Sequence, residues 1–495
     1  FAGTAQGRVG IGTTNPDLAV GVGNTIRLAV GIVSAYQFYG DGSNLSGLSG
    51  FSPDAQENLY AGTGAGASSD ADTCWNIGIG YSALYSQDAS GSYDGEKIVA
   101  IGCKAGCKST GGKEHVYIGA LAGSAQVAGY NNVFIGKYAG GDPSCTLNSE
   151  FNIGIGYAAL GGNTGNCNIA MGYETIKLGS GSHNFAVGRI AGGSNLASSN
   201  NMFIGECAGR YGISGTGHNI VIGKRAAFCA GTINHNIIMG NCAGRRMTSG
   251  ACNIVMGKDA AIGDGADVTG SHNIAMGNES GKSLTSASYN VYLGHQAGEE
   301  DDDGGYHVFV GDQAGRCMQG DSNIAIGRQA GKGSSTPGDN SGTDNISIGM
   351  YAGIALTSGA QNVLIGRNAG CTITSGGKNV VIGYQVAPAS TTGTGQLAIG
   401  CNGTCWISGD NSFVLTTRTH VPEANNTYDL GSSSLRWANI YTQDLELSNE
   451  AKKDTGGNDV DGTWGDWTLQ EGETEIFMIN NRTGKKFKIN MTEVT

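Results

Sequence analysis

Histidine, the side chain best suited to proton transfer near neutral pH, occurs eight times in the chain. None of these residues stands in a His-Glu-x-x-His arrangement, and the sequence contains neither a nucleophile elbow nor a P-loop. The glycine-rich segment 62–66 does not fit a phosphate-binding loop, because we expect no strand before it and no helix after it. These observations predict a protein with no catalytic residues and no cofactor.

Thirteen cysteines could bind metals or form disulfides. Cys103 and Cys107 are separated by three residues, as are Cys401 and Cys405, but no matching Cys or His pair follows at the spacing of a zinc site. An odd number of cysteines at irregular spacing also argues against a secreted disulfide framework. We therefore expect reduced thiols, most of them buried.

One run of five acidic residues, 299–303, contains the remaining candidate metal ligands. A turn exposed to solvent is our first interpretation of this run. The alternative is a calcium site formed by Asp301, Asp302 and Asp303 and completed by neighbouring chains.

Charge and composition exclude several classes of partner and fold. The chain has 41 acidic and 29 basic residues and no cluster of Lys and Arg, which argues against nucleic acid as a partner. Its apolar runs are too short to be inserted across a membrane. Glycine accounts for 87 of the 495 residues, which excludes a helical bundle. The apolar residues follow a pattern, which argues against disorder.

The glycines mark a repeat. Nineteen copies of a motif, in which a glycine follows an apolar triplet, recur about every 17 residues between Gly80 and Gly400. Residues 219–223, Asn-Ile-Val-Ile-Gly, are one copy, and we number positions from the glycine as zero. Position −4 is Asn in 15 of the 19 copies, positions −3 and −1 are apolar in all of them, and position +3 is Ala in 15.

This pattern predicts an all-β fold, a parallel β-solenoid of about 19 coils with about 17 residues each. Apolar residues at −3 and −1 share one face of a strand, which we expect to fill the coil. The small residues around x-x-Ala-Gly predict a second strand, and the glycine at zero predicts a corner with a positive φ. Eighteen steps of about 4.8 Å would give a rod of roughly 86 Å.

The Asn at −4 predicts a ladder of hydrogen-bonded amides along the rod. The alternative is a turn residue that tolerates the left-handed backbone conformation. The predicted ladder includes Asn132, Asn152, Asn168, Asn219, Asn236, Asn253, Asn273, Asn323, Asn362 and Asn379.

The residue types at position −2 indicate whether the chain associates with other chains. This position alternates with −3 and −1 and should therefore face outward, yet it is never charged and is aromatic in five copies. A strand that is apolar on both faces is covered on both faces, and the simplest cover is another copy of the chain. We therefore predict a parallel homotrimer wound about one axis, packed through Tyr117, Phe134, Phe203, Tyr292 and Phe309.

The limits of the repeat divide the chain. They predict an N-terminal β-rich segment at 1–72, a solenoid shaft at 73–404, a distal β-rich segment at 405–448, and a small C-terminal β-domain at 449–495. Within this last domain we expect a linker at 449–462 and a basic hairpin at 480–486.

Aromatic and basic side chains near the C-terminus are the candidates for binding a receptor, because an aromatic ring can stack on the apolar face of a sugar. They are Trp464, Trp467, Arg482, Lys485 and Lys486. The two tryptophans could instead form the core of the small domain. The insertions 81–97, 137–151 and 328–344 are alternative contact loops, since loops on a rigid scaffold commonly carry binding.

Several segments resemble known fibre proteins. The strand Asn-Ile-x-Ile-Gly, with Ala-Gly after it, resembles the head repeats of trimeric autotransporter adhesins and similar repeats of phage fibres. Residues 8–16, Arg-Val-Gly-Ile-Gly-Thr-Thr-Asn-Pro, and 38–48 look like tail-fibre segments, and 427–441 resembles the distal stretch of many phage tail fibres. The final block, with Glu-Gly-Glu at 471–473 and Gly-Lys-Lys-Phe-Lys at 484–488, resembles the ends of marine cyanophage virion proteins.

This resemblance implies a trimeric tail fibre of a virion, assembled in the host cytoplasm. Its partners would be itself, other tail proteins, and a polysaccharide or protein of the host surface. Many such fibres carry a self-cleaving chaperone at their end, and the 48 residues after Leu447 are too few for one.

Three alternatives remain open: a bacterial trimeric surface adhesin, a purely structural filament, and a polysaccharide-cleaving tailspike. The last would need a groove lined by carboxylates, whereas the strand positions of the repeat are almost free of Asp and Glu.

Overall fold

The computed structural model describes residues 2–3, 9–10 and 53–492, apart from gaps at 87–94, 143, 194–195, 212, 337–338, 418, 420–429, 431–433, 451–452, 454–455 and 459. At the N-terminus, β1 (Ala2–Gly3) pairs with β2 (Val9–Gly10) in antiparallel fashion. The other N-terminal fibre-like segments, and part of the stretch 427–441, lie outside the described residues.

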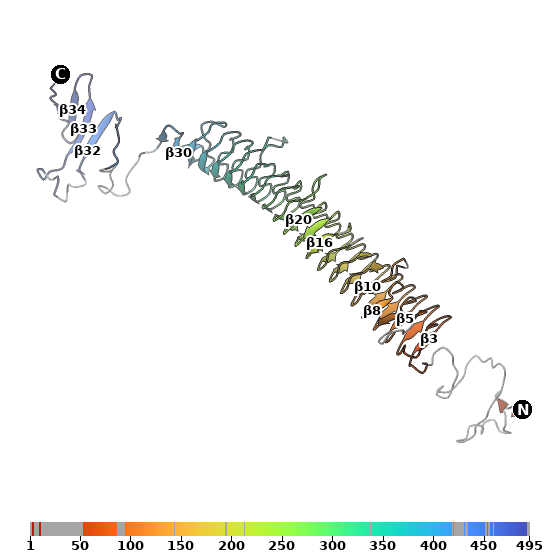
Figure 1. The fold of residues 1–495 in the computed structure, drawn as a ribbon. Coiled ribbons are helices and arrows are strands. Elements are labelled where there is room, and N and C mark those ends of the chain that lie inside the picture. Colours follow the sequence, from red (N-terminus) through yellow and green to blue (C-terminus); the bar gives the residue numbers. More distant parts are fainter. Residues whose placement is uncertain are drawn as a thin grey trace.

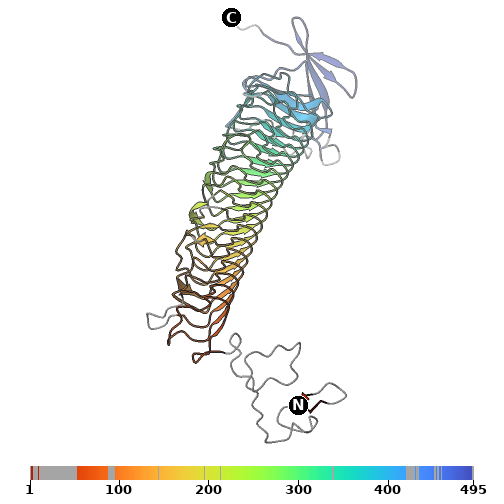
Figure 2. The same cartoon turned by 90° about the vertical axis from the view of Figure 1, so that its right-hand side faces the viewer.

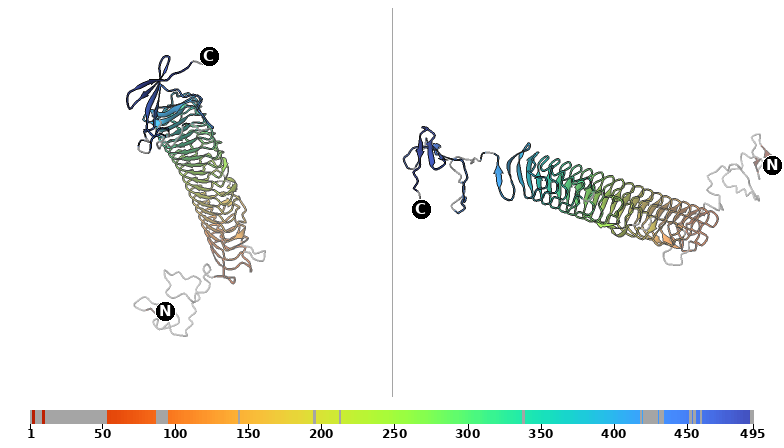
Figure 3. Two further views of the ribbon diagram at one scale, coloured as in Figure 1. Left: turned by 90° about the vertical axis from the view of Figure 1, so that its left-hand side faces the viewer. Right: turned by 90° about the horizontal axis from the view of Figure 1, so that it is seen from above.

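A ladder of short parallel strands forms a rod-like shaft (Figure 1). Each strand pairs with its equivalent one coil later, so that Ile220 lies beside Ile237 and Ile237 beside Ile254. The other views show the coils stacked along the rod's length (Figures 2 and 3). The predicted β-solenoid is therefore confirmed. Its strands are β3 (Leu59–Ala61), β4 (Ile77–Ile79), β5 (Val99–Ile101), β7 (Val116–Ile118), β9 (Val133–Ile135), β10 (Ile153–Ile155), β12 (Ile169–Met171), β14 (Phe185–Val187), β15 (Met202–Ile204), β17 (Ile220–Ile222), β19 (Ile237–Met239), β21 (Ile254–Met256), β22 (Ile274–Met276), β23 (Val291–Leu293), β24 (Val308–Val310), β25 (Ile324–Ile326), β26 (Ile346–Ile348), β27 (Val363–Ile365), β28 (Val380–Tyr384) and β29 (Leu397–Cys401).

The two faces of these strands are the reverse of the prediction. Position −2 points into the coil and is buried, whereas −3 and −1 point outward and stay partly exposed. The coil is narrow, so one central side chain per strand fills it together with the buried Ala at +3. The aromatic residues predicted to pack a trimer instead lie in the core of their own chain: Tyr117, Phe134, Phe203, Tyr292 and Phe309.

The second strand is also placed differently. The x-x-Ala-Gly segment forms turns, because positions +2 and +4 adopt the left-handed conformation, as Cys242 (φ 56°) and Gly244 (φ 54°) do. In some coils a second strand lies instead just before position −5. These strands are β6 (Gly111–Lys113), β8 (Ala128–Tyr130), β11 (Gly162–Asn163), β13 (Leu178–Gly179), β16 (Ser214–Gly217), β18 (Thr232–Asn234) and β20 (Ser249–Ala251).

The glycine at zero turns the corner between strand and turn, as predicted. Gly223 has a φ of +132°, and a Cβ there would lie 2.3 Å from the carbonyl oxygen of Gly240 in the next coil. This corner thus requires glycine for two reasons, its backbone conformation and the close approach of the next coil.

The predicted asparagine ladder is present. The backbone N–H of Asn236 donates to Oδ1 of Asn219 (3.0 Å), and that of Asn253 donates to Oδ1 of Asn236 (2.8 Å). Most of these amides also donate forward, as from Nδ2 of Asn253 to the carbonyl oxygen of Gly270 (3.0 Å). These asparagines are buried, so the ladder satisfies backbone groups that water does not reach.

The shaft begins one coil earlier than position 73. Asn58 accepts the N–H of Asn76 (2.8 Å), and β3 pairs with β4 in the same register as later coils. Segment 62–66 thus does follow a strand, and turns rather than a helix come after it. The sequence pattern missed this coil because position −1 is the small Ala61 instead of Ile, Val, Leu or Met.

At the other end, an antiparallel hairpin closes the shaft. It consists of β30 (Thr404–Gly409), which pairs with β29, and β31 (Val414–Thr416). A separate four-stranded antiparallel sheet contains β32 (Asp444–Ser448), β33 (Asp466–Glu471), β34 (Ile476–Asn480) and β35 (Lys486–Lys488). The predicted linker 449–462 therefore connects two strands of one sheet. The predicted hairpin is present, with Gly484 at a φ of +67°.

Candidate functional site

The outward side chains at −3 and −1 form an uninterrupted surface that we name the apolar strip. It runs along the shaft from Ile77 to Ile399 and contains no charged or polar residue. In β17, Ile220 is 38% exposed while its neighbour Val221 is fully buried. Nothing in the described part of this chain covers the strip.

Columns of equivalent residues flank the strip. At position −5, exposed rings stack between coils: those of Tyr289 and Tyr306 have centroids 5.3 Å apart, and those of His218 and His235 5.0 Å apart. At position +1 of three successive coils, charges of alternating sign follow one another, where Glu206 lies between Arg189 (3.6 Å) and Lys224 (3.3 Å).

An external amide ladder occupies position +2 of four successive coils. Nε2 of Gln296 donates to Glu279 (2.9 Å), that of Gln313 to Gln296 (2.7 Å) and that of Gln329 to Gln313 (2.7 Å). Sequence reasoning missed the columns at +1 and +2, although the recurrence of Gln at +2 was a signal that could have revealed the amide ladder.

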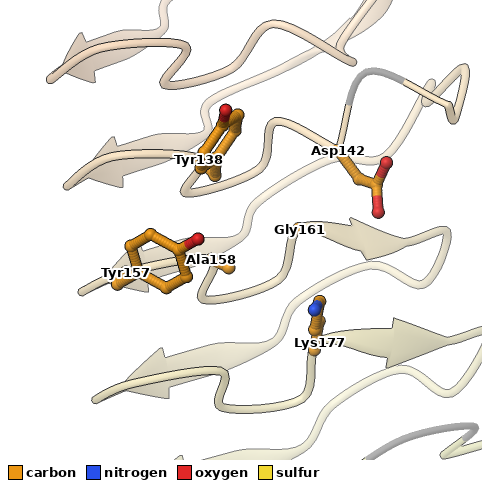
Figure 4. Close-up of a pocket in the computed structure, with 6 residues that line it drawn as sticks. All are labelled: Tyr138, Asp142, Tyr157, Ala158, Gly161 and Lys177. Carbon is orange, nitrogen blue, oxygen red and sulfur yellow. The ribbon is translucent and has the colours of Figure 1, made fainter.

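A cleft opens beside the predicted contact loop 137–151, and Figure 4 shows the residues that line it. Its volume is about 300 Å³, and it is lined by Tyr138, Asp142, Tyr157, Ala158, Gly161 and Lys177. The two tyrosines stand at one end, and Asp142 and Lys177 lie at the other, on coils separated by the coil that contains Gly161. Small residues between them leave the space open.

Both charged groups of the cleft are held in their ionised forms. Hydrogen bonds from the hydroxyl (2.6 Å) and backbone N–H (3.0 Å) of Ser144 lower the pKa of Asp142 below its usual value. A hydrogen bond to Glu174 (2.8 Å) raises the pKa of Lys177. The cleft therefore presents one fixed anion and one fixed cation to a ligand.

The C-terminal receptor candidates do not form one cluster of exposed aromatic rings. The guanidinium of Arg482 lies over the half-buried ring of Trp464, 3.7 Å from its centroid, and donates to the carbonyl oxygen of Trp464 (2.8 Å). Trp467 lies in β33 and contacts Phe487, with ring centroids 5.6 Å apart. Lys485 and Lys486 are exposed at the hairpin. Whether these residues bind a receptor stays a prediction.

The acidic run is partly buried, which contradicts the interpretation of it as a solvated turn. Asp301 points into the core and is fully buried, where it accepts hydrogen bonds from the hydroxyl of Tyr292 and the N–H of Gly304 (3.0 Å). Burial raises the pKa of its carboxyl well above the usual value. Since this side chain is directed inward, Asp301 does not combine with Asp302 and Asp303 in one calcium site.

The remaining candidates for chemistry stay apart. Among the described residues, no group of three or more His, Cys, Asp or Glu side chains is placed to hold a metal ion. The cysteines are free thiols, but most are partly exposed or exposed, and only Cys207 and Cys317 are buried. The prediction of mostly buried thiols is therefore wrong, because many of them lie on the outward turns. In the described part of the chain, no helix is long and apolar enough to cross a membrane.

Comparison with known proteins found no matching family model, curated protein or solved structure.

Proposed function

We propose that the protein is a trimeric fibre of a virion, and that it attaches the particle to a host cell surface. The apolar strip is the observation that carries this proposal. Surfaces of this kind, long and free of charge, mark sites of protein association. The strip replaces the aromatic residues at −2 as the surface through which the three chains would pack.

The size of the strip suits a stable interface. Eighteen steps of about 4.8 Å between the nineteen coils from Ile77 to Ile399 make it about 86 Å long, and a width of about 10 Å gives roughly 860 Å². A stable interface of standard size buries about 800 Å² per partner, whereas the largest apolar patch of a typical monomer is roughly 300–600 Å². The C-terminal sheet also favours association between chains. In its four strands only Thr468 is buried, so a single chain leaves the other strand residues partly or fully exposed.

The shape of the molecule supports attachment as the role of the assembly. Parallel copies of a rigid rod would place identical binding surfaces side by side, and several weak contacts then act together. The resemblance of the repeat and of the terminal segments to phage fibres favours a virion over a bacterial surface. Without a contribution from binding, the same assembly would be a purely structural filament.

Two measurements on the purified full-length protein test the proposal. Light scattering after size-exclusion chromatography should give three times the chain mass of 50.4 kDa. Fluorescently labelled fibre should then bind to a subset of a panel of marine cyanobacterial strains, in a saturable manner. A stable monomer would exclude the trimer, and a trimer that binds none of the strains would favour the structural filament.

A further inference from the structure

We propose that the cleft between Tyr138, Tyr157, Asp142 and Lys177 is a binding site for one neutral sugar unit of a surface polysaccharide. This inference rests on the proposed attachment function and names the ligand class that one part of the shaft recognises. At this cleft, aromatic rings and a pair of opposite charges border one hollow.

The tyrosines supply the apolar contact that sugars require. Tyr138 and Tyr157 meet edge to face, with centroids 5.8 Å apart, and Tyr157 stacks on Tyr173 at 5.0 Å. These contacts fix the orientation of the Tyr157 ring while 40% of the residue stays exposed. A fixed aromatic ring at the end of a hollow suits the C–H face of a pyranose.

The charged pair supplies hydrogen bonds of both kinds. The Asp142 carboxylate only accepts, and the Lys177 ammonium only donates. A hydroxyl group can do either, so separate hydroxyls of one sugar can donate to Asp142 and accept from Lys177. Bonds to ionised partners are also the stronger kind, which favours a polyhydroxyl ligand over an apolar one.

The charge balance favours a neutral sugar. Glu174 is bonded to Lys177, and Lys137 lies over the ring of Tyr138 at 5.2 Å. Asp142 and Lys177 line the hollow, and the nearby Glu174 and Lys137 leave the charges around its border in balance. A carboxylated sugar would meet the repulsion of Asp142, and an amino sugar that of Lys177. A volume of about 300 Å³ is at the lower end of the usual range for ligand sites, which limits the ligand to about one sugar unit.

The test titrates intact fibre with the methyl glycosides of glucose, galactose, mannose and N-acetylglucosamine, and with glucuronic acid and glucosamine. Saturation-transfer NMR reports the binding. We expect saturable binding of at least one neutral glycoside, with a Kd on the order of 1 mM, and weaker binding of both charged sugars. Absence of saturable binding to all four neutral probes overturns the proposal, as does a preference for a charged sugar.

Variants locate the binding. Tyr157→Ala should weaken it at least tenfold, and Asp142→Asn and Lys177→Gln each severalfold. Tyr81→Ala is the matched control, because Tyr81 occupies the same repeat position and is exposed on a different coil. It should leave the affinity unchanged. If Tyr157→Ala unfolds its coil, the two polar variants still decide the matter, and unchanged affinity in both overturns the assignment.

Cell attachment by the same variants separates this inference from the function on which it rests. Loss of both sugar and cell binding in Asp142→Asn supports both proposals. Sugar binding that depends on Asp142, in a fibre that attaches to no cell, supports the sugar site and overturns the attachment function. If a variant that has lost sugar binding still attaches to cells as the wild type does, the cleft is not the surface that contacts the host.

Discussion

Two histidines replace asparagine in the internal ladder, and the ladder determines their protonation. Nδ1 of His115 accepts the N–H of Asn132 (3.1 Å), and Nδ1 of His307 accepts that of Asn323 (3.1 Å). In each neutral ring the proton must therefore be on Nε2. Nε2 of His307 lies 3.4 Å from the Asp301 carboxyl, but neither this atom nor Nε2 of His115 has a hydrogen-bond partner.

Replacing His115 by Asn should make the stability of the fold less sensitive to acid. Burial lowers the pKa of His115 from 6.5 to about 4, so the unfolded chain takes up this proton more readily than the folded one. The contribution of His115 to the free energy of unfolding is fully present above about pH 6.5. About 3 kcal/mol of it is lost as the pH falls toward 4. His115→Asn keeps the ladder acceptor without the titration. Melting curves at pH 7 and pH 4.5 should differ less for this variant than for the wild type.

Exposed His295 provides the control for that measurement. It pairs with Asp312 at the surface (2.8 Å), outside the ladder. His295→Asn should therefore retain the wild-type loss of stability in acid. Equal pH dependence in the wild type and His115→Asn would contradict the assigned role of the buried ring.

At the scale of the coil, glycine corners set how closely successive turns approach. Gly223 combines a positive φ with a neighbouring carbonyl at 2.3 Å from its would-be Cβ, whereas Gly265 has a positive φ (+86°) and nothing within 4 Å. Gly265→Ala should cost about 1 kcal/mol, because only the backbone conformation is disfavoured. Gly223→Ala should cost several times more. Denaturant unfolding compares the two, and similar losses would show that the coils can move apart.

The period, the corner glycines and the asparagine ladder could all be predicted from sequence, since each depends on one residue type at one position. The inward face could not, because −3, −2 and −1 are all apolar and periodicity alone does not distinguish two apolar faces. The sizes of the residues at −2 contained the signal that periodicity lacked. At −2, a large residue meets a small one at several steps: Tyr60 lies against Gly78, and Phe134 against Gly154. Such compensation is expected inside a packed core.

The cleft was only partly predictable. The insertion 137–151 identified its loop, but Tyr157 and Lys177 belong to the next two coils, and solenoid stacking alone brings them together. The candidates in the C-terminal sheet were chosen by residue type, and the structure engages Arg482 with Trp464 rather than leaving that ring free.

At the scale of the whole molecule, the apolar strip should govern assembly. Ile220→Lys places a charge in the middle of the strip, at a side chain 38% exposed in the single chain, so the coil itself should tolerate it. We expect a lower trimer mass fraction by light scattering at equal protein concentration. Asn241→Lys, at the exposed +1 position of the next coil, should leave assembly unchanged. If both variants assemble like the wild type, another surface holds the chains together.

Because every coil offers the next one the same ladder of hydrogen bonds, the reach of the shaft depends on how many coils the gene encodes. Removing residues 237–253, one full period, would bring Asn236 directly before Ile254 and preserve the register of everything beyond. The shaft would shorten by about 4.8 Å and remain otherwise intact. Unequal recombination between repeats would thus lengthen or shorten the shaft in fixed increments of one coil.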